Sequence, residues 1–168
     1  DLFLSDATIG DGVHLKPMVV IAESQVGTGS ILGPFCQLRP GSVLHEGVHV
    51  GNFVEVKKSE LGPGTKANHL AYLGDATIGR ETNVGAGTIT CNYDGFEKHR
   101  TVIGDRVQIG SDSQLVAPVT IADDAYVATG TTVRHDVEAG ALAFNPRPDQ
   151  RRVGWVEGFR KRKSAAKK

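Results

Sequence analysis

Aliphatic residues recur at every sixth position along most of this chain. The spacing shortens to five residues at three steps and lengthens once, between Ile78 and Ile103. A period of six matches neither an α-helix, with a period of 3.6, nor a plain strand, with a period of two. A short strand followed by a corner, repeated many times, explains the pattern. The recurring positions are Ile9, Leu15, Ile21, Val26, Leu32, Leu38, Leu44, Val50, Val56, Leu61, Ala67, Leu73, Ile78, Val84, Ile103, Ile109, Leu115, Ile121, Val127 and Val133.

Glycine follows the aliphatic residue at many of these steps, as at Gly27 and Gly62, where a tight corner leaves no room for a larger side chain. Three units close one triangular coil of 17 or 18 residues. We therefore predict an all-β, parallel β-helix of hexapeptide repeats over residues 1–141. The longer interval predicts a loop that leaves the helix within about residues 90–101, and such insertions usually mark a binding face.

The charge balance and cysteine content narrow the class of protein. The 168 residues carry 19 Lys plus Arg against 19 Asp plus Glu. We expect no nucleic-acid or membrane partner, because both need an excess of cations or a long apolar span. Two cysteines do not make a disulfide framework, which favours a cytoplasmic location. Eight of the 19 cations lie from residue 151 onward, so residues 142–168 are predicted to form an irregular basic tail.

Stacking of coils at about 4.8 Å places residues that are distant in sequence next to one another. Arg39 and Lys57 occupy equivalent positions in successive coils, and Tyr72 lies near the same corner. We expect these two cations to lack an acidic partner. A corner of that kind is suited to bind an anion, although two solvated surface side chains would give the same pattern.

A second column begins at His69 and continues through small residues. Ala86, Ser111 and Thr129 hold the equivalent position in the next three coils, a length of roughly 14 Å. A face lined by small side chains can hold a long thin ligand with its reactive end at the imidazole. Asn83 is placed to approach the same site. From the pattern alone, a surface or corner histidine with no task is the favoured interpretation of His69.

The remaining histidines do not predict a metal site. His45 and His49 are four residues apart but lie on either side of a corner, so a shared zinc ion is disfavoured. Cys36 and Cys91 have no evident base nearby, and we interpret them as small interior or loop residues rather than nucleophiles. No metal cofactor is therefore expected for this domain.

Five stretches of the chain resemble one family closely. It is the C-terminal acetyltransferase domain of the bacterial bifunctional UDP-N-acetylglucosamine pyrophosphorylase and glucosamine-1-phosphate N-acetyltransferase. The resemblance covers the chain to about residue 145, and the motif that ends Thr-Cys-Asn-Tyr-Asp-Gly is more specific than a generic hexapeptide. The stretches are residues 38–41, 51–58, 69–75, 83–95 and 110–119.

The resemblance implies a left-handed β-helix, an exception to the usual right-handed crossover, assembled as a homotrimer with active sites between subunits. It implies acetyl transfer from acetyl-CoA to glucosamine 1-phosphate, a step of UDP-N-acetylglucosamine biosynthesis that feeds peptidoglycan and lipopolysaccharide synthesis. Nothing in the chain resembles the nucleotidyltransferase half, which binds magnesium in this family. The chain, which opens at Asp1 in mid-repeat, thus looks like the second half of such a protein.

The resemblance also assigns roles residue by residue. His69 matches the catalytic base, and an ordinary imidazole, which titrates near pH 6.5, can accept a proton from the attacking amine. The matching sugar-phosphate contacts are Arg39, Lys57, Tyr72, Asn83 and Lys98, of which Lys98 is expected to come from a neighbouring subunit. The matching acetyl-CoA contacts are Ala86, Asn92, Tyr93, Ser111, Thr129 and, as a substitute for a family arginine, Arg147.

Two departures from the family pattern bear on the cofactor. Thr129 stands where the family has alanine, and Pro146 stands where it has the arginine that meets the cofactor phosphate, with Arg147 one residue later. Three alternatives stay open. They are a hexapeptide acyltransferase with another acceptor, a zinc-dependent trimer similar to carbonic anhydrase, and a non-catalytic β-helix that trimerises a partner domain.

Overall fold

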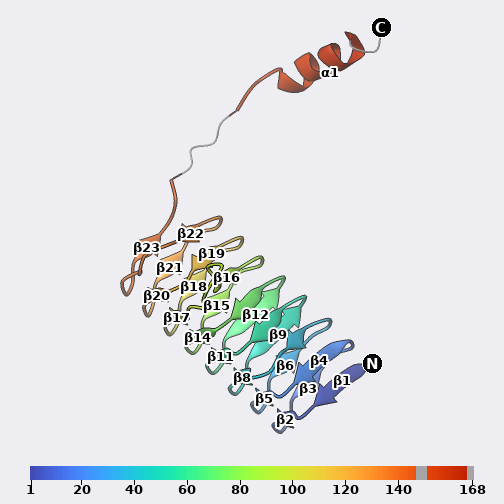
Figure 1. Cartoon of the computed structure of the whole chain (residues 1–168), viewed down its shortest axis with the longest axis vertical. Coiled ribbons are helices and arrows are strands. Elements are labelled where there is room, and N and C mark those ends of the chain that lie inside the picture. Colours follow the sequence, from blue (N-terminus) through green and yellow to red (C-terminus); the bar gives the residue numbers. More distant parts are fainter. Residues whose placement is uncertain (147–150, 166–168) are drawn as a thin grey trace.

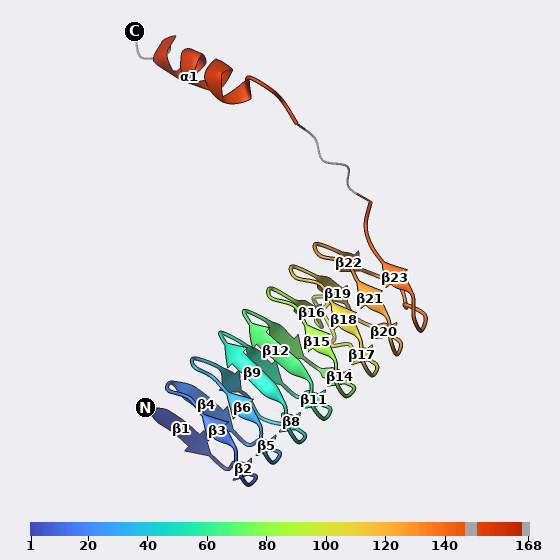
Figure 2. The same cartoon turned by 180° about the vertical axis from the view of Figure 1, so that it is seen from behind.

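In the computed structural model, which describes residues 1–146 and 151–165, three short strands and three corners make each coil, and successive coils stack in parallel. Figures 1 and 2 show these coils from opposite sides as one long stack that ascends from the N-terminus. The predicted all-β class and the parallel solenoid are confirmed, and the arrangement is consistent with the predicted left-handed β-helix.

Each face of the prism is one parallel sheet, here named A, B and C in the order in which the chain visits them. Sheet A contains β1 (Leu2–Ser5), β4 (Val19–Ala22), β7 (Gln37–Leu38), β10 (Glu55–Lys57), β13 (Tyr72–Gly74), β16 (Ile89–Cys91), β19 (Gln114–Val116) and β22 (Thr132–Val133). Sheet B contains β2 (Thr8–Ile9), β5 (Gln25–Val26), β8 (Val43–Leu44), β11 (Glu60–Leu61), β14 (Ala76–Ile78), β17 (Thr101–Ile103) and β20 (Val119–Ile121). Sheet C contains β3 (His14–Leu15), β6 (Ile31–Leu32), β9 (His49–Asn52), β12 (Lys66–His69), β15 (Asn83–Val84), β18 (Gln108–Ile109), β21 (Tyr126–Val127) and β23 (Leu142–Ala143).

The periodic aliphatic residues form the core. Nearly all of them are buried, and large members such as Leu38, Leu61, Leu73 and Ile109 are fully inaccessible to solvent. Each coil is too thin to bury its own apolar face, so the core is made by stacking. Register is consequently fixed, because a slip by one residue would turn the aliphatic side chains outward.

Glycine and hydroxyl residues make the corners. A β-carbon on Gly62 would lie 2.7 Å from the carbonyl carbon of Gly79 in the next coil, so glycine is required at that close approach. Buried hydroxyls satisfy corner carbonyls. Ser59 Oγ, for example, donates to the carbonyl of Leu73 at 3.1 Å and accepts from the N–H of Ala76 at 2.9 Å.

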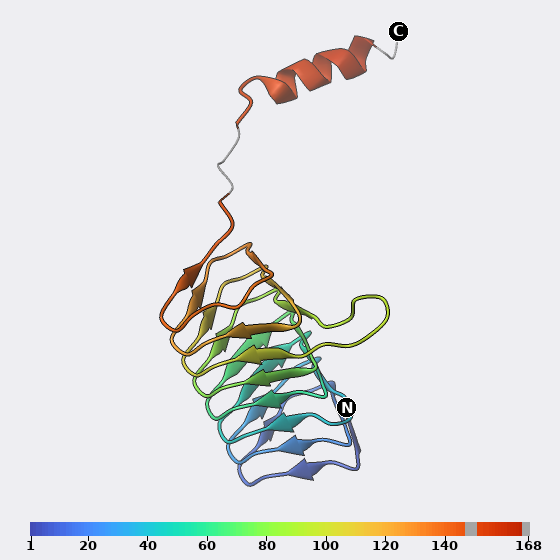
Figure 3. The same ribbon diagram turned by 60° about the vertical axis from the view of Figure 1, so that its left-hand side comes forward.

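The inserted segment leaves the stack between β16 and β17, at the corner where sheet A ends, and Figure 3 shows it protruding from the body. The structure agrees with the predicted interruption of the repeat. Strand β23 extends the solenoid to Ala143, two residues beyond the expected boundary at residue 141.

The expectation of an irregular tail was wrong for residues 155–165, which form helix α1 (Trp155–Ala165). The helix has Glu157 in its first turn and Arg162 and Lys163 in its last, which suits the helix dipole. Lys161 also pairs with Glu157 one turn away at 3.0 Å. The hexapeptide pattern did not predict this helix because the helix lies after the last repeat.

Candidate active site

The column that begins at His69 is confirmed by the strand register. Lys66 and Ala67 pair with Asn83 and Val84, which places His69 beside Ala86 one coil later. The next pairings carry the column to Ser111 and Thr129. His69, Ser111 and Thr129 are exposed and Ala86 is partly exposed. Small side chains therefore line this corner between sheets C and A for three coils beyond the imidazole.

Asn52 is a polar neighbour of His69 that the sequence analysis missed. It lies in register with His69 one coil earlier, and its Oδ1 is 3.2 Å from His69 Nδ1. Both residues line a hollow of about 240 Å³ together with Lys16 and His49. The 17-residue separation of Asn52 and His69, one coil length, was the signal that could have identified the pair.

The cationic corner, defined as Arg39, Lys57 and Lys98, lies at the other edge of sheet A. Glu55 and Val56 pair with Gln37 and Leu38, so Lys57 stacks directly above Arg39 as predicted. Tyr72 begins the neighbouring strand β13 and pairs with Glu55. His69 precedes Tyr72 by three residues, at the corner where sheet A begins, so His69 and the cationic corner lie at opposite edges of the same sheet.

The expectation that these cations lack an acidic partner was wrong for Arg39. Its Nη1 donates to Glu55 Oε1 at 2.8 Å, and this bond is the main reason that the pKa of Arg39 is raised. Glu55 belongs to the next coil and points outward beside Lys57, and the hydrophobic period carries no information on such outward pairing. Both side chains remain more than one-third exposed, so the ion pair is a weak one.

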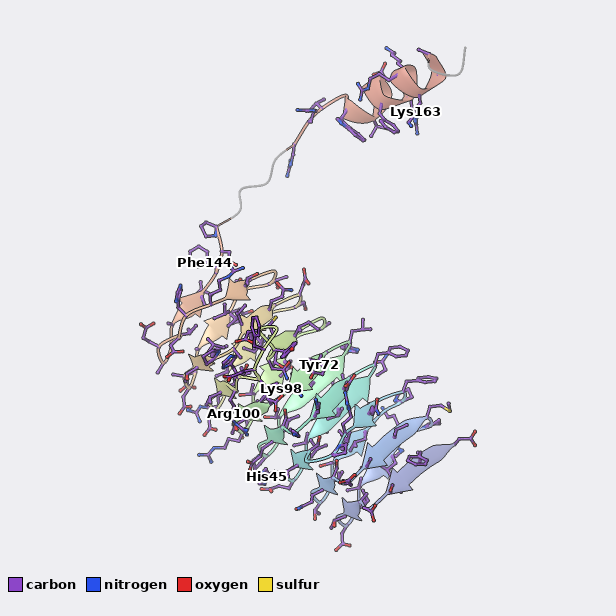
Figure 4. All side chains as sticks on the ribbon, in the orientation of Figure 1. His45, Tyr72, Lys98, Arg100, Phe144 and Lys163 are labelled. Atoms are coloured by element: carbon purple, nitrogen blue, oxygen red, sulfur yellow. The ribbon has the colours of Figure 1, made fainter. Side chains whose placement is uncertain are left out.

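Within this chain Lys98 comes to this corner from the inserted loop and lies close to Lys57. That a neighbouring subunit supplies Lys98 concerns an assembly and stays a prediction. The ammonium group of Lys98 lowers the pKa of Lys57, first through a close side-chain contact and then through charge repulsion, to which Arg39 adds. Figure 4 labels Lys98 and Tyr72 in this region. Three cations therefore gather here, opposed by the carboxylates of Glu55 and Asp75.

Asn92 and Tyr93 lie at the start of the inserted loop. The Asn92 amide is buried, and it donates to Asp75 Oδ2 and, at 3.4 Å, to the hydroxyl of Tyr72. Tyr93 is 60% exposed, and its hydroxyl donates to the carbonyl of Gly95. The expected cofactor residues thus fall at two places, because Asn92 and Tyr93 follow β16 whereas Ala86 precedes it.

The inserted loop is held by its own polar contacts. Asp94 accepts from the backbone N–H groups of Glu97 and Phe96 at 2.7 and 2.8 Å, and its other oxygen lies 2.7 Å from His99 Nε2. These bonds, that of the Glu97 N–H first, hold the pKa of Asp94 far below its usual range. Lys98 therefore lies in a turn that is held by hydrogen bonds.

Asn83 stands on the outer face of sheet C, in register with Lys66 and Gln108. It lies one coil above the strand that carries His69, as expected. Arg147 lies outside the described residues, and Pro146 before it is exposed.

The other sequence-based candidates have ordinary surroundings. Burial raises the pKa of the Cys36 thiol to about 12 and also raises that of Cys91, which agrees with their interpretation as unreactive residues.

Within residues 1–146 and 151–165 no group of three or more His, Cys, Asp or Glu is placed to hold a metal ion. In the same part of the chain, no helix is long and apolar enough to span a membrane. A separate hollow of about 490 Å³ lies at the last coil between Thr131 and Asn145 and contains none of the candidate residues.

Comparison with known proteins agrees with this picture. Residues 100–135 match the family model described as bacterial transferase hexapeptide (six repeats). The chain is 53% identical over 152 residues to the bifunctional protein GlmU of Pelobacter propionicus, covering 90% of this chain and 33% of that protein. It is 52% identical over 160 residues to GlmU of Acidithiobacillus ferrooxidans, covering 95% and 35%. The chain thus spans about one third of the length of these relatives.

Solved structures share the fold at low sequence identity. LpxA, a UDP-N-acetylglucosamine acyltransferase from Bacteroides fragilis, matches with a TM-score of 0.65 at 14% identity, over 96% of this chain and 76% of that one. The GDP-perosamine N-acetyltransferase of Caulobacter crescentus, solved with CoA and GDP-perosamine, matches with a TM-score of 0.62 at 24% identity, over 71% and 53%. This chain therefore contains a bacterial transferase hexapeptide domain and is similar, over almost its whole length, to the C-terminal part of the bifunctional GlmU proteins.

Proposed function

We propose that this domain transfers the acetyl group of acetyl-CoA to the amino group of glucosamine 1-phosphate. The observation that carries the proposal is the placement of an exposed histidine and a cationic corner at opposite edges of sheet A. A basic nitrogen at one end and three cations at the other suit an acceptor that carries an amine and a phosphate. The GlmU relatives and the CoA-bound acetyltransferase neighbour support acetyl transfer as the reaction class.

His69 would act as the general base. The sugar amine forms a bond to the thioester carbonyl carbon and passes one proton to the imidazole. The tetrahedral intermediate then collapses, the carbon–sulfur bond breaks, and coenzyme A leaves as a thiolate that takes up a proton. Amine and thioester held side by side react directly, so no acyl-enzyme is required.

The backbone beside His69 offers a donor for the developing oxyanion. The N–H of Ala86 donates no hydrogen bond within the described part of the chain, although the neighbouring Gly85 N–H is bound to the carbonyl of Ile109. A free, fixed N–H next to the base is the arrangement that stabilises a tetrahedral intermediate. We assign this role to Ala86, and to Asn83 the orientation of the sugar ring.

The cationic corner would bind the 1-phosphate. Arg39 offers a planar guanidinium for charge-assisted hydrogen bonds, and Lys57 and Lys98 offer ammonium groups. Crowding lowers the pKa of Lys57, and a bound dianion relieves that repulsion. The Arg39–Glu55 pair is weak because it is exposed, so it can hold the guanidinium in place without preventing phosphate binding. Tyr72 stands between this corner and His69.

The column of small residues would hold coenzyme A, with Ser111 and Thr129 along its path. Asn92 and Tyr93 follow strand β16 and lie at the other edge of sheet A. One cofactor molecule would therefore more easily contact the small-residue column of one chain and Asn92 and Tyr93 of another than both sets in a single chain. This geometry supports a homotrimer with active sites between subunits. Arg147, outside the described residues, is proposed as a contact to the cofactor phosphate in place of the family arginine that aligns with Pro146.

The product would be N-acetylglucosamine 1-phosphate. In a full-length protein of the GlmU kind, we expect it to pass to a uridylyltransferase domain, which needs magnesium, and to enter UDP-N-acetylglucosamine biosynthesis in the cytoplasm. This chain itself would use acetyl-CoA as a co-substrate and no metal.

The experiment is a product assay by mass spectrometry with acetyl-CoA and a panel of acceptors. Glucosamine 1-phosphate should be acetylated. Glucosamine should react poorly because it lacks the phosphate, and uridine-linked glucosamine should react poorly because its phosphate is attached to a bulky nucleoside. Mass detection avoids interference from the two protein thiols. Acetylation of another acceptor would point to a different hexapeptide acyltransferase, and no acetylation by a trimeric protein would refute the proposal.

A further inference from the structure

His69 and the following residue, Leu70, each contact Asn52 of the preceding coil. The backbone N–H of Leu70 donates to the carbonyl of Asn52 at 3.0 Å. The side chains meet as well, with 3.2 Å between His69 Nδ1 and Asn52 Oδ1. The backbone bond sets the spacing of the two α-carbons, so the amide lies beside the imidazole as a consequence of coil stacking.

The imidazole has no other side-chain partner within the described residues. In the next coil its neighbour is Ala86, which has no polar side-chain atom, and no hydrogen bond to Nε2 occurs in the described part of the chain. One ring nitrogen is therefore engaged by protein, and the other has no hydrogen-bond partner among the described residues. A general base needs this division, because the nitrogen that accepts the proton must not carry one already.

We propose that Asn52 is a positioning residue that fixes the tautomer of His69, its amide oxygen accepting Nδ1–H so that the lone pair of Nε2 faces the acceptor amine. The proposal rests on the assignment of His69 as the base. The opposite amide orientation would donate to Nδ1 and place the proton on Nε2, which could then only donate. Asn52 does not touch the reacting atoms and acts through His69.

An amide performs this task without adding charge. The charged or titratable groups that share the hollow with His69 are Lys16 and His49, and no carboxylate lines it. A carboxylate at position 52 would also accept Nδ1–H but would stabilise the imidazolium form, which raises the pKa of a histidine. The exchange Asn52→Asp therefore separates the two consequences of the contact, since it keeps the acceptor and adds a charge.

The test uses the full chain with Asn52→Ala, Asn52→Asp and, as a control on the outer face of sheet B, Gln25→Ala. Nitrogen NMR of the imidazole reports the tautomer in the absence of any substrate. We expect the Nδ1–H form in the wild type and in Gln25→Ala, and a mixture of tautomers in Asn52→Ala. A wild-type ring protonated at Nε2, or an unchanged spectrum in Asn52→Ala, would overturn the proposal.

Kinetics give a second readout. Asn52→Ala should lower kcat by about 10- to 100-fold, the size of effect seen when the hydrogen-bond partner of a metal-ligating histidine is removed, with little change in the KM for acetyl-CoA. Asn52→Asp should recover much of this loss and move the acidic limb of kcat/KM upward by about one pH unit or more. An unmoved limb would show that position 52 does not act through the ring.

The two readouts keep this inference separate from the proposed function. If the wild-type protein acetylates none of the acceptors, the assignment of the reaction fails, but the NMR result still decides whether Asn52 sets the tautomer. If acetylation occurs and neither the tautomer nor the pH profile responds to position 52, only the role of Asn52 is refuted.

Discussion

Thr90 supports the strand that carries Tyr72, and its removal gives a sharp test of how the sheet A face is held. Its Oγ1 accepts the N–H of Gly74 at 2.7 Å and lies 3.0 Å from the carbonyl of Gly74, to which it donates. Thr90 is 1% exposed, and Gly74 is buried at the end of β13. No water can replace the hydroxyl at this position, because the group is enclosed by the neighbouring coils.

The change Thr90→Val keeps the shape of the side chain and replaces the hydroxyl by a methyl group. It leaves the Gly74 N–H buried without a partner, a loss of about 1 to 3 kcal/mol. A methyl carbon also needs about 3.5 to 4 Å from its neighbours, so β13 must move away by roughly 1 Å. The matched control Thr90→Ser keeps the oxygen, and its cost is limited to one buried methyl group, about 1 kcal/mol.

The assay is urea unfolding followed by circular dichroism at one fixed protein concentration, because assembly would make stability depend on concentration. Thr90→Val should unfold at lower urea with an unchanged slope, and it should raise the KM for glucosamine 1-phosphate because Tyr72 begins the displaced strand. If Thr90→Val were as stable as the wild type, or if Thr90→Ser were the less stable variant, the hydrogen bond to Gly74 would not support the strand.

Three further outcomes follow from the site. His69→Ala should lower turnover by about 100- to 10,000-fold while acetyl-CoA affinity, measured by calorimetry, is retained. Turnover equal to that of the wild type would refute the assignment of His69 as the general base. Lys57→Ala should chiefly raise the KM for glucosamine 1-phosphate. An unchanged KM would refute the role of the cationic corner in phosphate binding. Because Lys98 lowers the pKa of Lys57, Lys57 loses its charge as the pH rises at values below the ordinary lysine value near 10.4. As the pH is raised, the KM for glucosamine 1-phosphate should therefore begin to increase at a lower pH in the wild type than in Lys98→Met. Identical pH profiles of KM in the two proteins would contradict this coupling.

The sequence predicted the solenoid and both polar columns because the repeat fixes register. Once each coil is known to take 17 or 18 residues, the stacking of Lys57 on Arg39 and of Ala86 on His69 follows from counting alone. The departure from the repeat after β16 located the inserted loop in the same way. Helix α1 was missed because it lies beyond the last repeat, and its signals are local charges in its first and last turns.

The sequence by itself therefore determined which residues share a corner, since apolar burial leaves each coil a single register. Only the tertiary structure decided which side chains pair there. Glu55 reaches Arg39, Asn52 meets His69, and Lys98 folds back on Lys57 of its own chain. These contacts join outward-facing side chains of different coils or of the loop, and their geometry depends on rotamers and loop path, which the hydrophobic period leaves free.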